Sequence, residues 1–196
     1  MEKHGGRVTT TEERVSSNVI RLCNVIFGHD FLDDLLALND GKNRVDHETG
    51  GMPSDFWTGV TEALNCASDD DATASTVILS EEDPHYEEVM ELDFNDYDLM
   101  TSAVVRKKFN LLMKIRKIIR KNMTLSGEHD NDAFNFVELA MKKAGSCTGV
   151  SVLGVYYFHA LCDANPDIDV NFADKMDDAL MGNTNQIGRA SCRERV

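Results

Sequence analysis

The stretch from Arg106 to Lys121 limits the fold more than any other part of the chain. It contains eight of the twenty Lys and Arg residues and no Asp or Glu, although the chain has a net charge of −14. At about 100° per residue, one side of a helix over 99–122 collects the apolar residues Val104, Leu111, Leu112, Ile115, Ile118 and Ile119. The opposite side collects Arg106, Lys107, Asn110, Lys114, Lys117 and Lys121. Arg116 and Arg120 fall on the flanks and Lys108 on the apolar side, so the pattern predicts an amphipathic helix with an exposed basic face.

The residues before this helix carry the opposite charge. Asp69–Asp98 contains twelve Asp and Glu residues and no Lys or Arg. Two interpretations follow from this segregation. In the first, the basic helix is exposed to an anionic partner. In the second, the acidic segment neutralises the helix within the same chain, and the sequence leaves both interpretations open.

Helical periodicity recurs in five other segments, namely 12–27, 29–39, 54–65, 133–144 and 152–162. Thr11 is the expected N-cap of the first segment, and the short apolar run at 152–162 also fits a buried strand. We therefore expect an all-α, single-domain bundle of five to seven helices over 12–180, with an acidic irregular insertion at 67–98. Its core is expected to include the aromatic residues Trp57, Phe109, Phe134, Phe136, Tyr156 and Phe158.

Both ends of the chain are expected to lie outside this domain. Residues 1–11 read as a mobile N-terminus. The last ten residues, IGRASCRERV at 187–196, resemble the translation of a sequencing adapter joined to a transcript, and we expect them to be artefactual. On that interpretation the native C-terminus is missing from the sequence.

The sequence contains no motif that specifies a reaction. It has no glycine-rich phosphate loop, and its five cysteines form no Cys-x-x-Cys pair. The carboxylate-rich loop at 126–132 is better explained as the end of one helix and the cap of the next. The loop at 167–178 places Phe172 where a calcium loop needs glycine. We therefore expect a non-enzymatic protein without a metal or other cofactor. No apolar run is long enough for a bilayer, so no membrane partner is expected. The start of the chain lacks the apolar segment of a secretory signal, so a nuclear or cytoplasmic location is predicted.

Two stretches resemble a known helical family. Phe56–Asn65 is similar to the first helix of Myb/SANT-like (trihelix-type) domains, in which an aromatic-Trp pair is followed by Val and then Leu-Asn. Val105–Lys114 is similar to their basic third helix, with Phe109 where that helix usually carries Trp. The Myb/SANT-like elements would thus occupy 54–66 and 99–122, with the acidic insertion of 67–98 between them. The resemblance implies a helical module of the DNA-binding type.

A broader resemblance covers most of residues 20–178. The block from Ser126 to Val137, the run Val155–Phe158 and the segment Arg21–Phe27 are similar to uncharacterised proteins of oomycetes and other protists. This resemblance implies no activity.

Charge and resemblance together lead to one expected function and one alternative. The expected function is a DNA-binding or chromatin-associated module in which a basic helix over 106–121 contacts phosphates. The contacting residues would be Arg106, Lys107, Lys114, Lys117 and Lys121, and Asn110 could reach a base edge. The alternative is a protein–protein interaction module whose basic helix binds an acidic partner or its own acidic segment.

Overall fold

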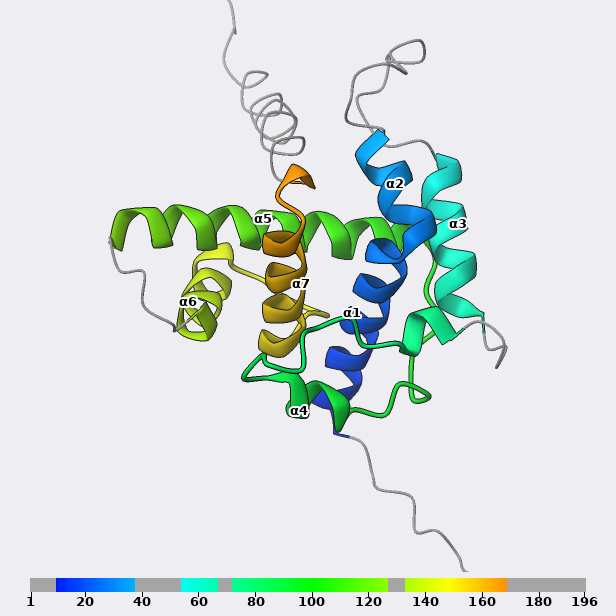
Figure 1. Ribbon diagram of the computed structural model, residues 1–196, viewed down its shortest axis with the longest axis horizontal. Helices are drawn as coiled ribbons and strands as arrows, with labels where there is room; N and C mark the ends of the chain where they lie inside the picture. Colours follow the sequence, from blue (N-terminus) through cyan, green and yellow to red (C-terminus); the bar gives the residue numbers. More distant parts are fainter. Residues whose placement is uncertain (1–9, 38–53, 67–71, 127–132, 169–196) are drawn as a thin grey trace, which may run out of the picture.

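The computed structural model describes residues 10–37, 54–66, 72–126 and 133–168, and their regular structure is entirely helical (Figure 1). The α-helices are α1 (Thr11–Phe27), α2 (His29–Ala37), α3 (Ser54–Asn65), α4 (Tyr86–Met90), α5 (Ser102–Ser126), α6 (Ala133–Ala144) and α7 (Val152–Ala164), with a 3₁₀ turn at Ala72–Ser75. The predicted all-α bundle of five to seven helices is confirmed. No helix among the described residues has the length and apolar character needed to cross a membrane.

Helix α1 runs through the middle of the bundle. Its N-cap is Thr10, one residue before the predicted Thr11, because the Thr10 side chain accepts a hydrogen bond from Glu13 N while Glu13 Oε2 accepts one from Thr10 N. Every residue from Ser16 to Phe27 is buried. Gly28 ends the helix, and its backbone N–H donates to Asn24 O.

Helix α7 packs closely on α1, which explains its almost wholly apolar composition. A methyl group added at Gly154 would lie 2.8 Å from Cβ and Cγ1 of Val19, so only glycine permits this separation. Ser151 caps the helix by accepting a hydrogen bond from Gly154 N, and its Oγ also accepts one from Ser16 Oγ of α1 at 2.8 Å. The strand interpretation of this segment is therefore wrong, and the helix interpretation is confirmed.

Aromatic rings join α3, α5 and α7. Trp57 of α3 lies 5.4 Å from Phe109 of α5 between ring centroids, and Phe109 lies 5.9 Å from Phe158 of α7 in an edge-to-face contact. Of the six aromatic residues expected in the core, Trp57, Phe109, Tyr156 and Phe158 are buried. Phe134 and Phe136 are only half-buried, because they lie on α6 at the edge of the bundle.

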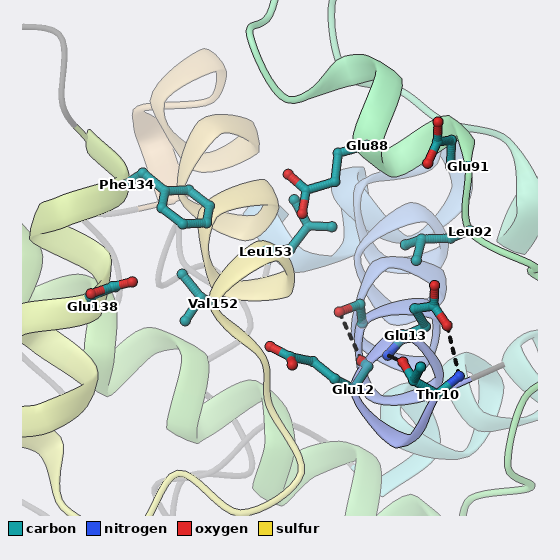
Figure 2. Close-up of a pocket in the computed structure, with 11 residues that line it drawn as sticks. Thr10, Glu12, Glu13, Glu88, Glu91, Leu92, Phe134, Glu138, Val152 and Leu153 are labelled. Atoms are coloured by element: carbon teal, nitrogen blue, oxygen red, sulfur yellow. Dashed lines mark hydrogen bonds between the residues drawn. The ribbon is translucent and has the colours of Figure 1, made fainter.

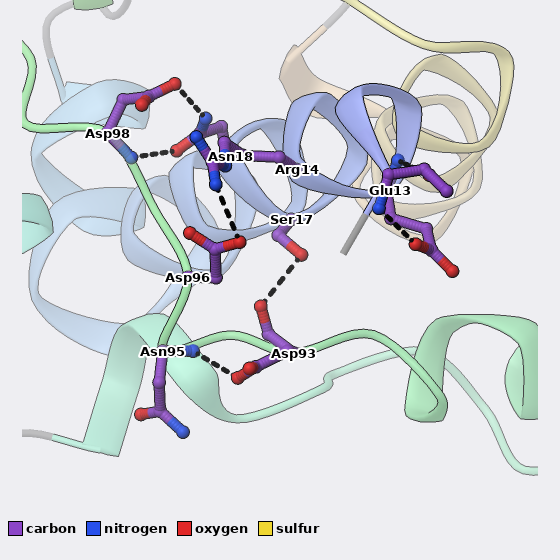
Figure 3. Close-up of polar contacts among 9 residues, drawn as sticks. Glu13, Arg14, Ser17, Asn18, Asp93, Asn95, Asp96 and Asp98 are labelled. Atoms are coloured by element: carbon purple, nitrogen blue, oxygen red, sulfur yellow. Dashed lines mark hydrogen bonds and ion pairs between the residues drawn. The ribbon is translucent and has the colours of Figure 1, made fainter. Parts of the chain in front are cut away.

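The described part of the acidic segment, residues 72–98, lies along a polar stripe of α1. Five α1 residues spaced by about one helical turn bind it, namely Arg14, Ser17, Asn18, Arg21 and Asn24. Figure 3 shows the first three. Arg14 pairs with Asp96 at 3.0 Å, Ser17 donates to Asp93 O, and the Asn18 amide exchanges two hydrogen bonds with Asp98. The predicted insertion is thus irregular but anchored, with α4 as its short helix.

Two glycine substitutions test the close packing of α7 on α1. We expect Gly154→Ala to reduce the free energy of unfolding by about 1–3 kcal/mol, because the new methyl group overlaps Val19. Gly59→Ala on α3 is the matched control. Its methyl group would meet only the edge of the half-buried Phe31 ring at 3.3 Å, while alanine raises helix propensity by up to about 1 kcal/mol. Urea unfolding followed by circular dichroism measures both, and equal losses would contradict the packing argument.

Candidate nucleic-acid interface

The outer side of α5 carries all six of the residues predicted to contact nucleic acid. We define the basic face as the exposed side chains of Arg106, Lys107, Asn110, Lys114, Lys117 and Lys121. A helix rises about 1.5 Å per residue, so this face extends over about 22 Å. The structure therefore brings the predicted residues together on one straight surface.

The inner side of α5 is packed along most of its length. Its fully buried residues are Val105, Phe109, Leu112, Ile115, Arg116 and Ile119, and they face α3, α6 and α7. Val104 differs from the prediction, because 43% of it is exposed. It lies in the first turn at the edge of the apolar arc, where less of the bundle covers it.

Arg116 does not belong to the basic face, although the helical wheel places it on the flank. Its side chain is buried, and it donates to Asp163 Oδ1 at 2.9 Å and to His159 O at 3.0 Å. It also contacts His159 Nδ1, which must accept because a guanidinium can only donate. This cation therefore holds α5 against α7 and is not available to a ligand.

Lys108 is also structural. It is half-buried, and its ammonium group donates to Gly149 O in the loop before α7. Burial lowers the pKa of Lys108, and the negative charge of Asp98 partly opposes that shift. Gly149 has φ of +82°, a conformation that favours glycine and that presents its carbonyl to Lys108.

The C-terminal end of α6 adds positive charge beside the basic face. Lys114 Nζ donates to Ala144 O at 3.2 Å, and Lys143 Nζ donates to Asn122 Oδ1 at 2.9 Å. Lys143 is not among the contact residues that the sequence predicts. The only local signal is the Lys142-Lys143 pair before Gly145, which is equally explained by the dipole of α6.

The acidic segment makes its polar contacts on the other side of the bundle. The segment binds α7 as well as α1. Asp83 accepts hydrogen bonds from the Tyr156 hydroxyl of α7, and Tyr157 OH of the same helix accepts one from Ile78 N. Figure 1 places α4 at the opposite side of the molecule from α5. The acidic residues around α4 are thus separated from α5, whereas Asp98 lies close enough to Lys108 to oppose the lowering of its pKa.

A cleft of about 400 Å³ lies between α1, α4, α6 and α7 (Figure 2). Its lining includes five glutamates, namely Glu12, Glu13, Glu88, Glu91 and Glu138, and it contains no Lys or Arg. Three of them have structural partners, because Glu13 completes the α1 cap, Glu88 pairs with His85 and Glu138 pairs with Lys142. This cleft would repel a nucleic acid.

The described residues form no candidate metal centre. Among the described residues, no group of three or more His, Cys, Asp and Glu side chains is arranged to hold a metal ion. Of the loop at 126–132 only Ser126 is described, and of the loop at 167–178 only Asp167 and Ile168. The tail at 187–196 lies outside the described residues.

Comparisons with family models, with curated proteins and with solved structures give no match to this chain. The Myb/SANT-like and protist resemblances therefore stay predictions.

A pair of substitutions on α5 separates the structural cation from the surface cations. We expect Arg116→Gln to lower the free energy of unfolding by about 2 kcal/mol, because hydrogen bonds from a charged group to Asp163 and His159 are lost in a buried site. Lys121→Gln changes the same net charge on the same helix and should stay within about 0.5 kcal/mol of wild type. Chemical unfolding of both variants measures this, and similar stabilities would show that Arg116 does not hold α5 in place.

Proposed function

We propose that this protein is a non-enzymatic DNA-binding module, nuclear or chromatin-associated, that holds the phosphate backbone against the basic face of α5. The single observation that carries the proposal is the exposure of all six predicted residues on one side of a helix whose other side is packed. Such a helix presents its charges in a fixed arrangement. A duplex carries one negative charge per about 1.7 Å of its axis, so several phosphates lie within reach of this face.

The net charge of −14 is compatible with this function because of where the charges lie. At physiological ionic strength, exposed charges are screened beyond about 8–10 Å. The acidic segment is anchored along α1 and α7, with α4 on the side of the bundle away from α5. A phosphate backbone at α5 would therefore experience mainly the local positive charge, while the acidic side would disfavour any other orientation.

The basic face supports contact with the backbone more than base recognition. Five of its six residues are Arg or Lys, which contact phosphate without reading sequence. Asn110, at the middle of the face, has the amide that could pair with a base edge. Sequence preference, where it exists, would depend on this side chain.

A second candidate function is binding of an acidic protein segment. It is supported by exposed apolar residues at the N-terminal end of α5, where Leu99 is 76% and Val104 is 43% exposed. An acidic partner with apolar residues could use both features, whereas DNA would use the cations alone. The contacts of the chain's own acidic segment with α1 and α7 favour a partner from outside the chain.

A triple substitution tests the proposed function. Arg106→Gln, Lys107→Gln and Lys121→Gln together should reduce the slope of log Kobs against log salt concentration by about 2.7, since each lost phosphate contact contributes about 0.9. Fluorescence anisotropy with labelled duplex DNA, at about 50–200 mM salt, measures it.

The matched control is Arg14→Gln with Lys142→Gln, which removes exposed cations that already have the carboxylate partners Asp96 and Glu138. We expect this control to bind as wild type does. Absence of wild-type binding at the lowest salt would refute the DNA proposal. In that case, capture of an acidic apolar peptide that is lost in Leu99→Ser would support the second function.

A further inference from the structure

The cationic surface becomes wider toward the C-terminal half of α5. The last turn of α6 lies against α5 between two hydrogen bonds, one from Lys114 to Ala144 and one from Lys143 to Asn122. Residues 114 and 122 are about 12 Å apart along a helix axis. Over this length the surface is formed by two helices instead of one.

The two adjacent lysines of α6 differ in their electrostatic state. Lys142 faces the carboxylate of Glu138 at 3.6 Å, which offsets its charge. Lys143 is bound to the neutral amide oxygen of Asn122, which orients its ammonium group toward α5 without neutralising it. Lys143 has no carboxylate partner among the described residues, and it adds an oriented charge beside Asn122, the residue after Lys121 of the basic face.

Lys114 also binds the end of α6, which leaves it fewer hydrogen-bond donors for a phosphate. One of its three ammonium protons is bound to the last carbonyl of α6, so fewer remain for a phosphate. Gly145, with φ of +87°, follows this carbonyl and ends α6 at that place. The end of α6 thus occupies one N–H donor of Lys114 in the basic face. It also places the ammonium group of Lys143 beside that face.

The sideways position of Lys143 relative to the basic face favours one form of nucleic acid over another. Packed helices have axes about 8–10 Å apart, which lies between the widths of the minor and major grooves of B-DNA, about 6 and 12 Å. Two backbones at such a separation exist in a duplex but not in a single strand. Single-strand binding also relies on exposed aromatic residues for base stacking, and Phe109, the only aromatic residue between 106 and 121, is fully buried.

We propose that Lys143 of α6 is a further phosphate-contacting residue, and that α5 and α6 together contact both strands of a DNA duplex. This inference rests on the proposed function, because it concerns the same surface. In this arrangement, one DNA strand follows the basic face while Lys143 contacts the other strand.

Comparison of Lys143→Gln with Lys142→Gln tests the inference in the full chain. The probes are a duplex of about 20 base pairs, longer than the basic face at 3.4 Å per base pair, and a single strand of the same sequence. On the duplex, Lys143→Gln should reduce the salt slope by about 0.9, and Lys142→Gln should leave it unchanged. On the single strand, Lys143→Gln should bind as wild type does, and Lys143→Arg should restore the slope on the duplex.

The outcomes separate this inference from the proposed function. Equal slopes for the two glutamine variants on the duplex, with wild-type binding intact, would overturn the role of Lys143 and leave α5 as the interface. Equal loss by Lys143→Gln on duplex and single strand would overturn the two-strand arrangement. If the wild-type protein binds neither the duplex nor the single strand, both proposals are refuted. Thermal unfolding of each variant establishes that the fold is retained.

Discussion

The arrangement of the bundle depends on the hydrogen bonds that the guanidinium group of Arg21 donates. This group is buried and donates to Leu64 O at the end of α3, to Phe94 O and to Ser75 Oγ, and it lies 3.8 Å from the centroid of the Tyr97 ring. One side chain thus connects α1 with α3 and with the acidic segment. Burial lowers the pKa of Arg21, yet an arginine keeps its charge at such a site, whereas a lysine would lose it more readily.

The anchoring of the acidic segment on α1 determines what α5 can do. The α1 side chains that bind this segment mostly contact its backbone or single carboxylates, and they hold the segment on one side of the bundle. Intramolecular neutralisation would require the acidic segment to cover α5. Because α1 binds the described part of the segment, residues 72–98, the basic face stays exposed.

Local signals in the sequence were sufficient for six of the seven α-helices among the described residues and for the six residues of the basic face, whereas α4 lies in a segment that was expected to be irregular. Periodicity predicts α6 and α7 closely, because each helix needs an apolar side to join the core. The same reasoning fails for Arg116, whose partners His159 and Asp163 are 43 and 47 residues away along the chain. It also misses Lys143, since only tertiary packing brings the end of α6 to Asn122. Helical periodicity indicates which side a residue is on, but not whether a buried partner or a neighbouring helix meets it there.

The packed backbone of α5 and the conformational entropy of its lysine side chains would have opposite effects on the proposed binding. The packed inner side holds the backbone of the helix, so a ligand would not have to order it. Each long side chain that becomes fixed on a phosphate still costs about 0.5–1.5 kcal/mol of conformational entropy. If this surface binds DNA as proposed, it would therefore need several phosphate contacts at once. Such binding would be sensitive to salt and tolerant of sequence, because phosphate contacts release counterions and do not read bases.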